Sequence, residues 1–354
     1  MILWTCTGFI TQPLRAAEPQ VRKYRACLVD TSKMSPIKEF RLIYEPLNEE
    51  NLFSEGDAVK GTVIVTLSKE TKVKSIFVKV KGDARVNWSK QSGGVEVVFK
   101  HHTRFFKDKE YLVKEDAGVE VLPIFTSFAG TLLPKGVHRF KFGLQIPQGD
   151  MPSSFKGTYG KIVYMLEAKL SRSWKCPVTV ETKLSFVSKS LSFRGKIVCP
   201  RSESVQKEIG VFSPGQIRMM AIVDRPVCSP GDTVSVVAKI YNSSSKKMKP
   251  KVSLQQDIVY PAKETKMTCN SRLWQIVGDT IEQNTEETFS CKVKIPANVF
   301  YTIHNCNIIS VQYHLKVYLD ISFAVDPSVI LPLVIVPRSF AALSPADLLQ
   351  LLLD

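Results

Sequence analysis

Hydrophobic and polar residues alternate along most of the chain with a period of two. One example is the segment 74–81, KSIFVKVK, in which isoleucine and valine share one face while phenylalanine and lysine share the other. Such alternation predicts β-strands with one buried face. Gly82-Asp83 and Gly93-Gly94 are expected to be turns between strands. Before residue 190 no long segment has a 3.6-residue period, so the pattern predicts many short strands, as is typical of an antiparallel sandwich.

The chain also contains an internal repeat. Residues 140–170 align without a gap to residues 289–319, and residues 53–59 (FSEGDAV) align to residues 228–234 (CSPGDTV). Two copies of one pattern predict an all-β fold class with two tandem antiparallel immunoglobulin-like β-sandwiches. The matched positions are Phe140 with Phe289, Ile146 with Ile295, Ile162 with Val311, Tyr164 with Tyr313, Leu166 with Leu315, and Leu170 with Leu319.

The chain length of 354 residues suits two domains of common size, each able to bury its own core. Residues 1–33 have no clean period and are expected to be a disordered or non-native extension. We expect the first domain over 34–193 and the second over 214–338, with a linker at 194–213 that includes an ill-defined first strand. Residues 339–354 are expected to form a short C-terminal helix or tail, capped by Ser344.

The chain is basic, with a formal net charge of +15. A basic surface suits phosphorylated peptides, anionic lipid or nucleic acid, although it also serves simple solubility. Nucleic acid is disfavoured because the basic residues are spread through alternating strands and no recognisable binding motif occurs. The eight cysteines show no CxxC pair, the apolar segment 1–10 makes a poor signal peptide, and no run has the length of a spanning helix. We therefore expect a cytosolic chain with reduced thiols.

No sequence feature predicts an enzyme, a metal site or a cofactor. The chain has no GxSxG, HExxH or Walker signature, and its five histidines are scattered. The segment 157–161 (GTYGK) resembles a phosphate loop, but it lacks the spacing and is expected to be a turn that opens a strand.

Seven separated segments are distinctive: GDAVKG at 56–61, KSIFVKV at 74–80, GDARVNW at 82–88, SFKGTYGKIVY at 154–164, CSPGD at 228–232, CNIISVQYHL at 306–315 and LPLVI at 331–335. They resemble the α-arrestins, the arrestin-domain-containing proteins, and most of all their arrestin domain-containing protein 3-like members. The resemblance covers about residues 37–336 and implies arrestin N and C domains in a cytosolic adaptor that binds membrane cargo and routes it through endosomes. Two features of the family are missing. No Pro-Pro-x-Tyr segment for ubiquitin ligases occurs, and Lys183 stands where receptor-sensing arrestins bury an arginine.

Two surfaces are candidates for partner binding. The first is a basic patch along one strand, expected at a sheet edge, that would bind acidic or phosphorylated cargo tails or anionic lipid; a solvated lysine-rich strand that resists edge pairing explains it equally well. The second is an LxxLL-like face in the tail, for which the alternative is a helix that folds back on its own sheet. Their residues are Lys72, Lys74, Lys79, Lys81 and Arg85 for the patch, and Leu348, Leu351 and Leu352 for the tail.

The sequence therefore predicts a non-enzymatic trafficking adaptor at the plasma membrane and endosomes, which binds cytoplasmic tails and sorting machinery by protein–protein contact. The first alternative is a structural subunit of an endosomal coat that shares the arrestin fold. The second is a cell-surface sandwich module, which would need secretion and paired cysteines.

Overall fold

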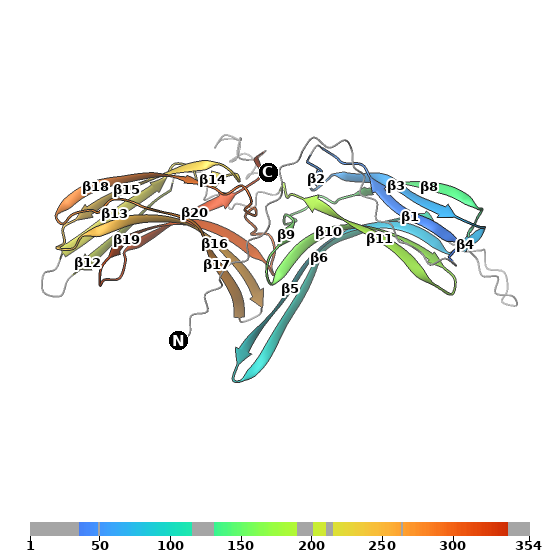
Figure 1. Ribbon diagram of the computed structural model, residues 1–354, viewed down its shortest axis with the longest axis horizontal. Helices are drawn as coiled ribbons and strands as arrows, with labels where there is room; N and C mark the ends of the chain where they lie inside the picture. The colour runs from blue at the N-terminus through green and yellow to red at the C-terminus, as the bar shows by residue number, and fades with distance from the viewer. Residues whose placement is uncertain are drawn as a thin grey trace.

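The computed structural model describes residues 35–48, 50–114, 131–189, 201–209, 215–262 and 265–338. The named elements in these ranges are all β-strands, which confirms the predicted fold class. The strands form two sandwiches that lie side by side, and the long hairpin of β5 (Ser75–Ser92) and β6 (Val95–Val113) projects from the body between them (Figure 1). The predicted extension (1–33) and the tail with Leu348, Leu351 and Leu352 lie outside the described residues.

The first sandwich consists of two main sheets and a two-stranded pair. One sheet has the order β1-β3-β8, and the other has the order β2-β11-β10-β5-β6, with β9 paired to β10. Strands β4 and β7 pair with each other. Their bounds are β1 Ile37–Tyr44, β2 Leu52–Phe53, β3 Ala58–Leu67, β4 Thr71–Val73, β7 Thr131–Leu133, β8 Gly136–Gln145, β9 Phe155–Lys156, β10 Gly160–Arg172 and β11 Lys175–Phe186.

The second sandwich repeats this topology. Its sheets have the orders β12-β13-β15-β18 and β14-β20-β19-β16-β17, and the second order matches β2-β11-β10-β5-β6 strand for strand. Strand β12 lies inside the segment predicted as a linker and pairs with β13. The bounds are β12 Arg201–Ile209, β13 Gly215–Val223, β14 Val227–Cys228, β15 Thr233–Asn242, β16 Met248–Ala262, β17 Thr265–Val277, β18 Thr285–Lys294, β19 Ser310–Ile321 and β20 Ser328–Ile335.

The repeated positions of the sequence form the equivalent cores of the two sandwiches. On β10 and β19 the matched side chains alternate with outward-facing ones and are all buried. Tyr164 and Tyr313 sit at the same place in each core, and each hydroxyl donates to a backbone carbonyl: Tyr164 to Pro152 at 2.7 Å, Tyr313 to Phe300 at 2.8 Å. Burial raises the pKa of both phenols above the ordinary value, so both stay protonated donors.

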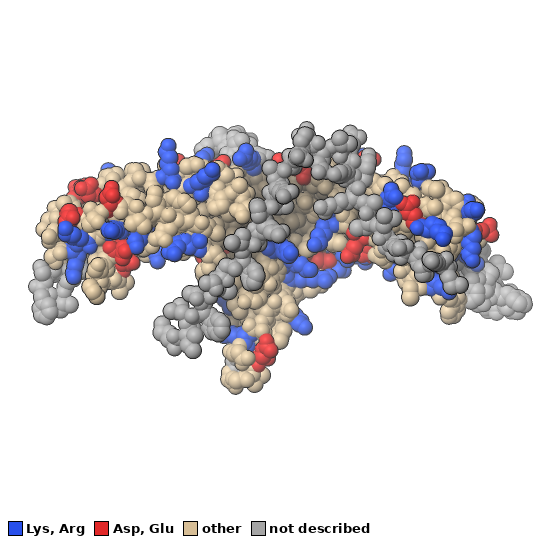
Figure 2. All heavy atoms as spheres, viewed as in Figure 1, with Lys and Arg blue, Asp and Glu red and all other residues tan. Residues whose placement is uncertain are grey.

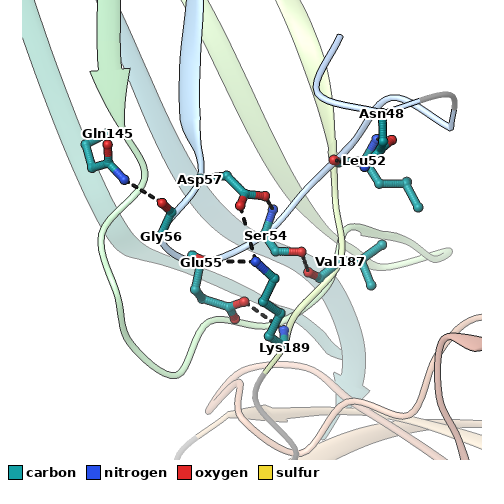
Figure 3. Close-up of polar contacts among 9 residues, drawn as sticks. All are labelled: Asn48, Leu52, Ser54, Glu55, Gly56, Asp57, Gln145, Val187 and Lys189. Carbon is teal, nitrogen blue, oxygen red and sulfur yellow. Dashed lines mark hydrogen bonds and ion pairs between the residues drawn. The ribbon is translucent and has the colours of Figure 1, made fainter. Parts of the chain in front are cut away.

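The repeated Gly-Asp turn is built from the same contacts in both copies, and Figure 3 shows the first copy. In the first copy Asp57 accepts the Ser54 amide at 2.7 Å, Ser54 Oγ donates to the Val187 carbonyl at 2.7 Å, and Gly56 has a φ of 78° that favours glycine. The turn therefore ties the strand before β3 to the end of β11. In the second copy Asp232 accepts the Ser229 amide at 2.9 Å, Ser229 Oγ donates to the Val336 carbonyl at 2.8 Å, and Gly231 has a φ of 89°.

Glu55 makes the first turn different from the second, where Pro230 holds the same position. The buried Glu55 carboxylate accepts the Ser188 hydroxyl and the Lys189 amide, both at 2.7 Å. Lys189 also reaches Asp57, with 3.2 Å between Nζ and Oδ1 (Figure 3). These contacts fix the last described residues of the first sandwich against its turn.

The prediction of a turn at Gly82-Asp83 is wrong, whereas Gly93-Gly94 does form the turn of the β5–β6 hairpin. Gly82 lies in the middle of β5, at a point where the pairing with β6 shifts register. A residue without a side chain is required at this position, because a Cβ there would lie 2.6 Å from the Tyr164 ring. A large core tyrosine and a bulge therefore explain this glycine.

The two sandwiches meet around Tyr260, which is fully buried near the end of β16. The turn 157–160 of the first sandwich packs against it, and a Cβ at Gly157 would lie 2.2 Å from its hydroxyl. Phe155 stacks edge-on against Phe300 at 4.8 Å between ring centroids. The segment with the phosphate-loop resemblance is thus a turn that opens β10, as predicted, and it packs against the second sandwich.

Candidate partner-binding face of the first sandwich

The basic residues of the first sandwich gather on the outward face of the sheet β11-β10-β5-β6. Even-numbered side chains of β5 and β10 pack into the core, so the odd-numbered ones point to solvent. The strand register then sets neighbours that are far apart in the sequence: Arg85 lies opposite Lys161 on one side and His102 on the other. Figure 2 shows lysine and arginine side chains clustered where the β5–β6 hairpin meets the body.

Lys79 and Lys81 are on this face, but they are held by Glu167 of β10. The Glu167 carboxylate lies 2.8 Å from Lys79 Nζ and 3.5 Å from Lys81 Nζ, and the three side chains are 10–18% exposed. Burial alone would raise the pKa of Glu167, but the hydrogen bond and charge of Lys79, with the charge of Lys81, lower it below the ordinary value. The expected edge position is wrong, because β5 lies between β10 and β6.

Asp83 is the second neutralised acid of this face. It is 5% exposed and lies 2.8 Å from both Arg104 Nε and His102 Nε2. Burial opposes the charged form of Asp83, but the hydrogen bonds from Arg104 and His102 and their charges lower its pKa below the ordinary value. Arg104 and His102 are therefore engaged within the sheet.

The structure does not bring the predicted patch together as one site. Lys72 is exposed on β4 opposite Leu132, and Lys74 is exposed just before β5 begins. Arg85 lies eleven residues beyond Lys74 along an extended strand, which is about 35 Å at the usual rise per residue. Lys72 and Lys74 therefore belong to the opposite end of the sheet from Arg85.

Arg85 instead lines a cavity of about 680 Å³ beside the turn 157–160. We call this cavity, lined by Arg85, Lys100, Lys156 and Lys161 with His101 and His102, the basic hollow. No carboxylate lines the basic hollow, and its lysines and Arg85 form no ion pair within the described ranges. Four cations without an ion pair among the described residues give this cavity a positive potential, which would favour anionic ligands.

Three of the basic hollow's cations were missed in the sequence: Lys100, Lys156 and Lys161. They come from β6, β9 and β10, and none of them lies near Arg85 in the chain. The only available signals were the basic run at 100–109 and the lysines that flank the Gly157–Gly160 turn. Their convergence depends on strand pairing, which composition does not reveal.

Metal-binding and reactive side chains are scattered over the described part of the chain. No cluster of three or more His, Cys, Asp or Glu that could hold a metal occurs there. Burial raises the pKa of the Cys291 thiol to about 11 and also raises that of Cys306, which lies in a loop. His314 of β19 contacts two side chains of the neighbouring strand β16: its Nε2 lies 3.1 Å from Gln255 Oε1, and its Nδ1 lies 3.4 Å from Asp257 Oδ2. No helix within the described ranges is long and apolar enough to span a membrane.

Two like sandwiches with a basic outward face define a tandem β-sandwich binding protein. The chain belongs to the arrestin family: the model of the arrestin (or S-antigen) N-terminal domain matches residues 41–192, and that of the C-terminal domain matches residues 213–340. Its relatives are α-arrestins, as the sequence resemblance predicted. Membership supports a non-enzymatic, arrestin-like adaptor.

Two relatives illustrate the distance within the family. The chain is 28% identical to thioredoxin-interacting protein of Homo sapiens over 307 residues, 86% of this chain and 75% of the relative. It is 27% identical to arrestin domain-containing protein 4 of Mus musculus over 302 residues, 84% of this chain and 72% of the relative. The nearer likeness to arrestin domain-containing protein 3-like members stays a prediction.

Proposed function

We propose that this chain is a cytosolic adaptor that binds acidic segments in the cytoplasmic tails of membrane proteins and links them to endosomal sorting machinery. The observation that carries the proposal is the basic hollow, with four cations that no carboxylate of the described residues neutralises. Lys79, Lys81 and Arg104 are engaged with Glu167 and Asp83, so the basic hollow is the stronger anion site of this face.

The fold suits presentation of such a site. The cations stand on β5, β6, β9 and β10, whose backbones are fixed by strand pairing, so little backbone freedom is lost on binding. Clustered cations also attract acidic segments at long range and raise the association rate. The second sandwich has its own outward face, which allows one chain to hold a tail and a sorting protein at the same time.

Recruitment of a ubiquitin ligase through Pro-Pro-x-Tyr is not part of the proposal, because the sequence contains no Pro-Pro pair. Peripheral association with the plasma membrane and endosomes would follow from the bound tails, since they are anchored there. An anionic membrane surface is the competing ligand for the same cations.

The test measures binding of fluorescent Glu-rich peptides to the full chain by anisotropy, and binding to phosphatidylserine vesicles by co-sedimentation. The paired charge reversals Arg85→Glu and Lys161→Glu are expected to weaken peptide binding at least about tenfold. Wild-type affinity is expected to fall about threefold or more between about 50 and 250 mM salt. The matched control, Lys69→Glu with Lys72→Glu, makes the same charge change at the far end and should leave affinity within about twofold.

In cells, proximity labelling should recover membrane proteins with acidic tails from the wild type and lose them from the Arg85→Glu, Lys161→Glu chain. Equal peptide affinity for the two double variants would refute the basic hollow as the site. A complex of fixed stoichiometry that does not depend on cargo would favour the coat-subunit alternative instead.

A further inference from the structure

An apolar strip lies in the middle of the basic face. Val163 and Met165 are successive outward residues of β10, and both are partly exposed. They line a groove of about 200 Å³ whose other lining residues are all charged. Those residues are Lys81, Asp83, Arg85, Lys161, Glu181 and Lys183.

The groove has an apolar floor and cationic sides. The strand register places Met165 between Lys81 of β5 and Lys183 of β11. Arg85 and Lys161 lie at one end, and both residues also line the basic hollow, so the two cavities are neighbours. Of the two acids, Asp83 is neutralised by Arg104 and His102. Glu181 then faces three cations that form no ion pair among the described residues: Arg85, Lys161 and Lys183.

The internal repeat shows that the fold does not require apolar residues at these positions. The second copy carries Gln312 and His314 where the first carries Val163 and Met165. The core neighbours on the same strands are alike, since Ile162, Tyr164 and Leu166 match Val311, Tyr313 and Leu315. The partly exposed Val163 and Met165 therefore give the first sandwich an apolar surface among cations that the sandwich core does not require.

From this geometry we infer that the groove selects acidic segments in which an aliphatic side chain stands between carboxylates. Lys81 and Lys183 lie about 10 Å apart across three strands, roughly the length of three extended residues. A peptide crossing the strands can therefore place one apolar side chain on Met165 and a carboxylate near Lys183, which forms no ion pair among the described residues. On the other side Lys81 lies 3.5 Å from Glu167, and its ammonium group keeps further donors for a second carboxylate. Polarizable methionine adapts to aliphatic side chains of different shape. The inference rests on the proposed function, because it specifies which acidic segments the adaptor recognises.

The test compares two peptides on the full chain, Gly-Ser-Glu-Glu-Leu-Glu-Glu-Ser-Gly and the same peptide with serine in place of leucine. Both carry the same charge, so the difference reports the apolar floor. We expect the leucine peptide to bind about tenfold more tightly to the wild type, as partial burial of one aliphatic side chain implies. Met165→Gln should reduce this preference to within about twofold while leaving the salt dependence of binding unchanged.

The matched control is His314→Gln, the same position in the second copy, which should keep the full leucine preference. A melting temperature recorded for each variant reports folding, and the two-peptide comparison on the wild type needs no variant. Equal affinity for both peptides would overturn the inference and leave the adaptor proposal standing. A phosphoserine peptide that binds more tightly than the leucine peptide would also overturn it. Binding to phosphatidylserine vesicles but to neither peptide would refute both proposals.

Discussion

The ion pairs of Glu167 give the sharpest test of how this face is built. Glu167→Gln keeps the shape of the side chain and removes its charge. Lys79 and Lys81 then remain only 16% and 18% exposed, with no carboxylate to neutralise them. The variant is therefore expected to destabilise the first sandwich.

The magnitude follows from burial and distance. An exposed ion pair contributes about 0–1 kcal/mol, whereas removing one partner of a buried pair costs about 3–5 kcal/mol. Glu167 is 10% exposed and holds Lys79 at 2.8 Å, but its lysines reach the surface, so an intermediate cost of about 2 kcal/mol is expected. For a domain of this size that cost lowers the melting temperature by about 4–8 °C.

The assay is urea unfolding followed by far-ultraviolet circular dichroism, with Glu181→Gln as the control. Glu181 lies directly opposite Glu167 on β11, is exposed and forms no ion pair among the described residues. A double-mutant cycle with Lys79→Met then isolates the coupling between Lys79 and Glu167. The same variant frees two cations, so it should also bind the Glu-rich peptides more tightly.

A Glu167→Gln chain whose free energy of unfolding lies within about 0.5 kcal/mol of the Glu181→Gln chain would refute this reasoning. That result would mean that Lys79 and Lys81 are solvated rather than neutralised. They would then be available to cargo, as the sequence suggested.

Two further predictions concern acid and the domain junction. The pKa values of Asp83 and Glu167 are lowered on folding, so their stabilisation is complete above the unfolded values near 4. This stabilisation is lost as pH falls through the pKa values of the folded state. The urea midpoint of unfolding should therefore be flat from about pH 7 to 5 and fall below about pH 4. A midpoint that rises below about pH 4 would contradict the lowered pKa values. Gly157→Ala should loosen the junction and raise the radius of gyration in X-ray scattering, because its Cβ would meet the Tyr260 hydroxyl at 2.2 Å. Tyr260→Phe in the same chain should partly restore the wild-type value, and an unchanged radius for Gly157→Ala would contradict the contact.

Local patterns in the sequence were sufficient to predict the strands and the duplication of the sandwich. The alternation in β5 and β10 reports which side of each strand is buried, and matched residues such as Tyr164 and Tyr313 do occupy the same core position. The pattern failed at Gly82, where a glycine that resembles a turn accommodates the ring of Tyr164 from another strand. A one-dimensional pattern cannot distinguish these two uses of glycine, because both require the absence of a side chain.

Which residues make up the candidate site could be learned only from the tertiary structure. The sequence by itself determined that two similar β-sandwiches would form and that lysines would line one strand face, because period-two alternation and a repeat are local properties of the chain. Only the tertiary structure decided which cations are neutralised: Glu167 lies 88 residues from Lys79, and Lys161 comes beside Arg85 through the pairing of β10 with β5. The interaction between two charges depends on their distance in space, is screened over about 10 Å at ordinary ionic strength, and is independent of their separation along the chain.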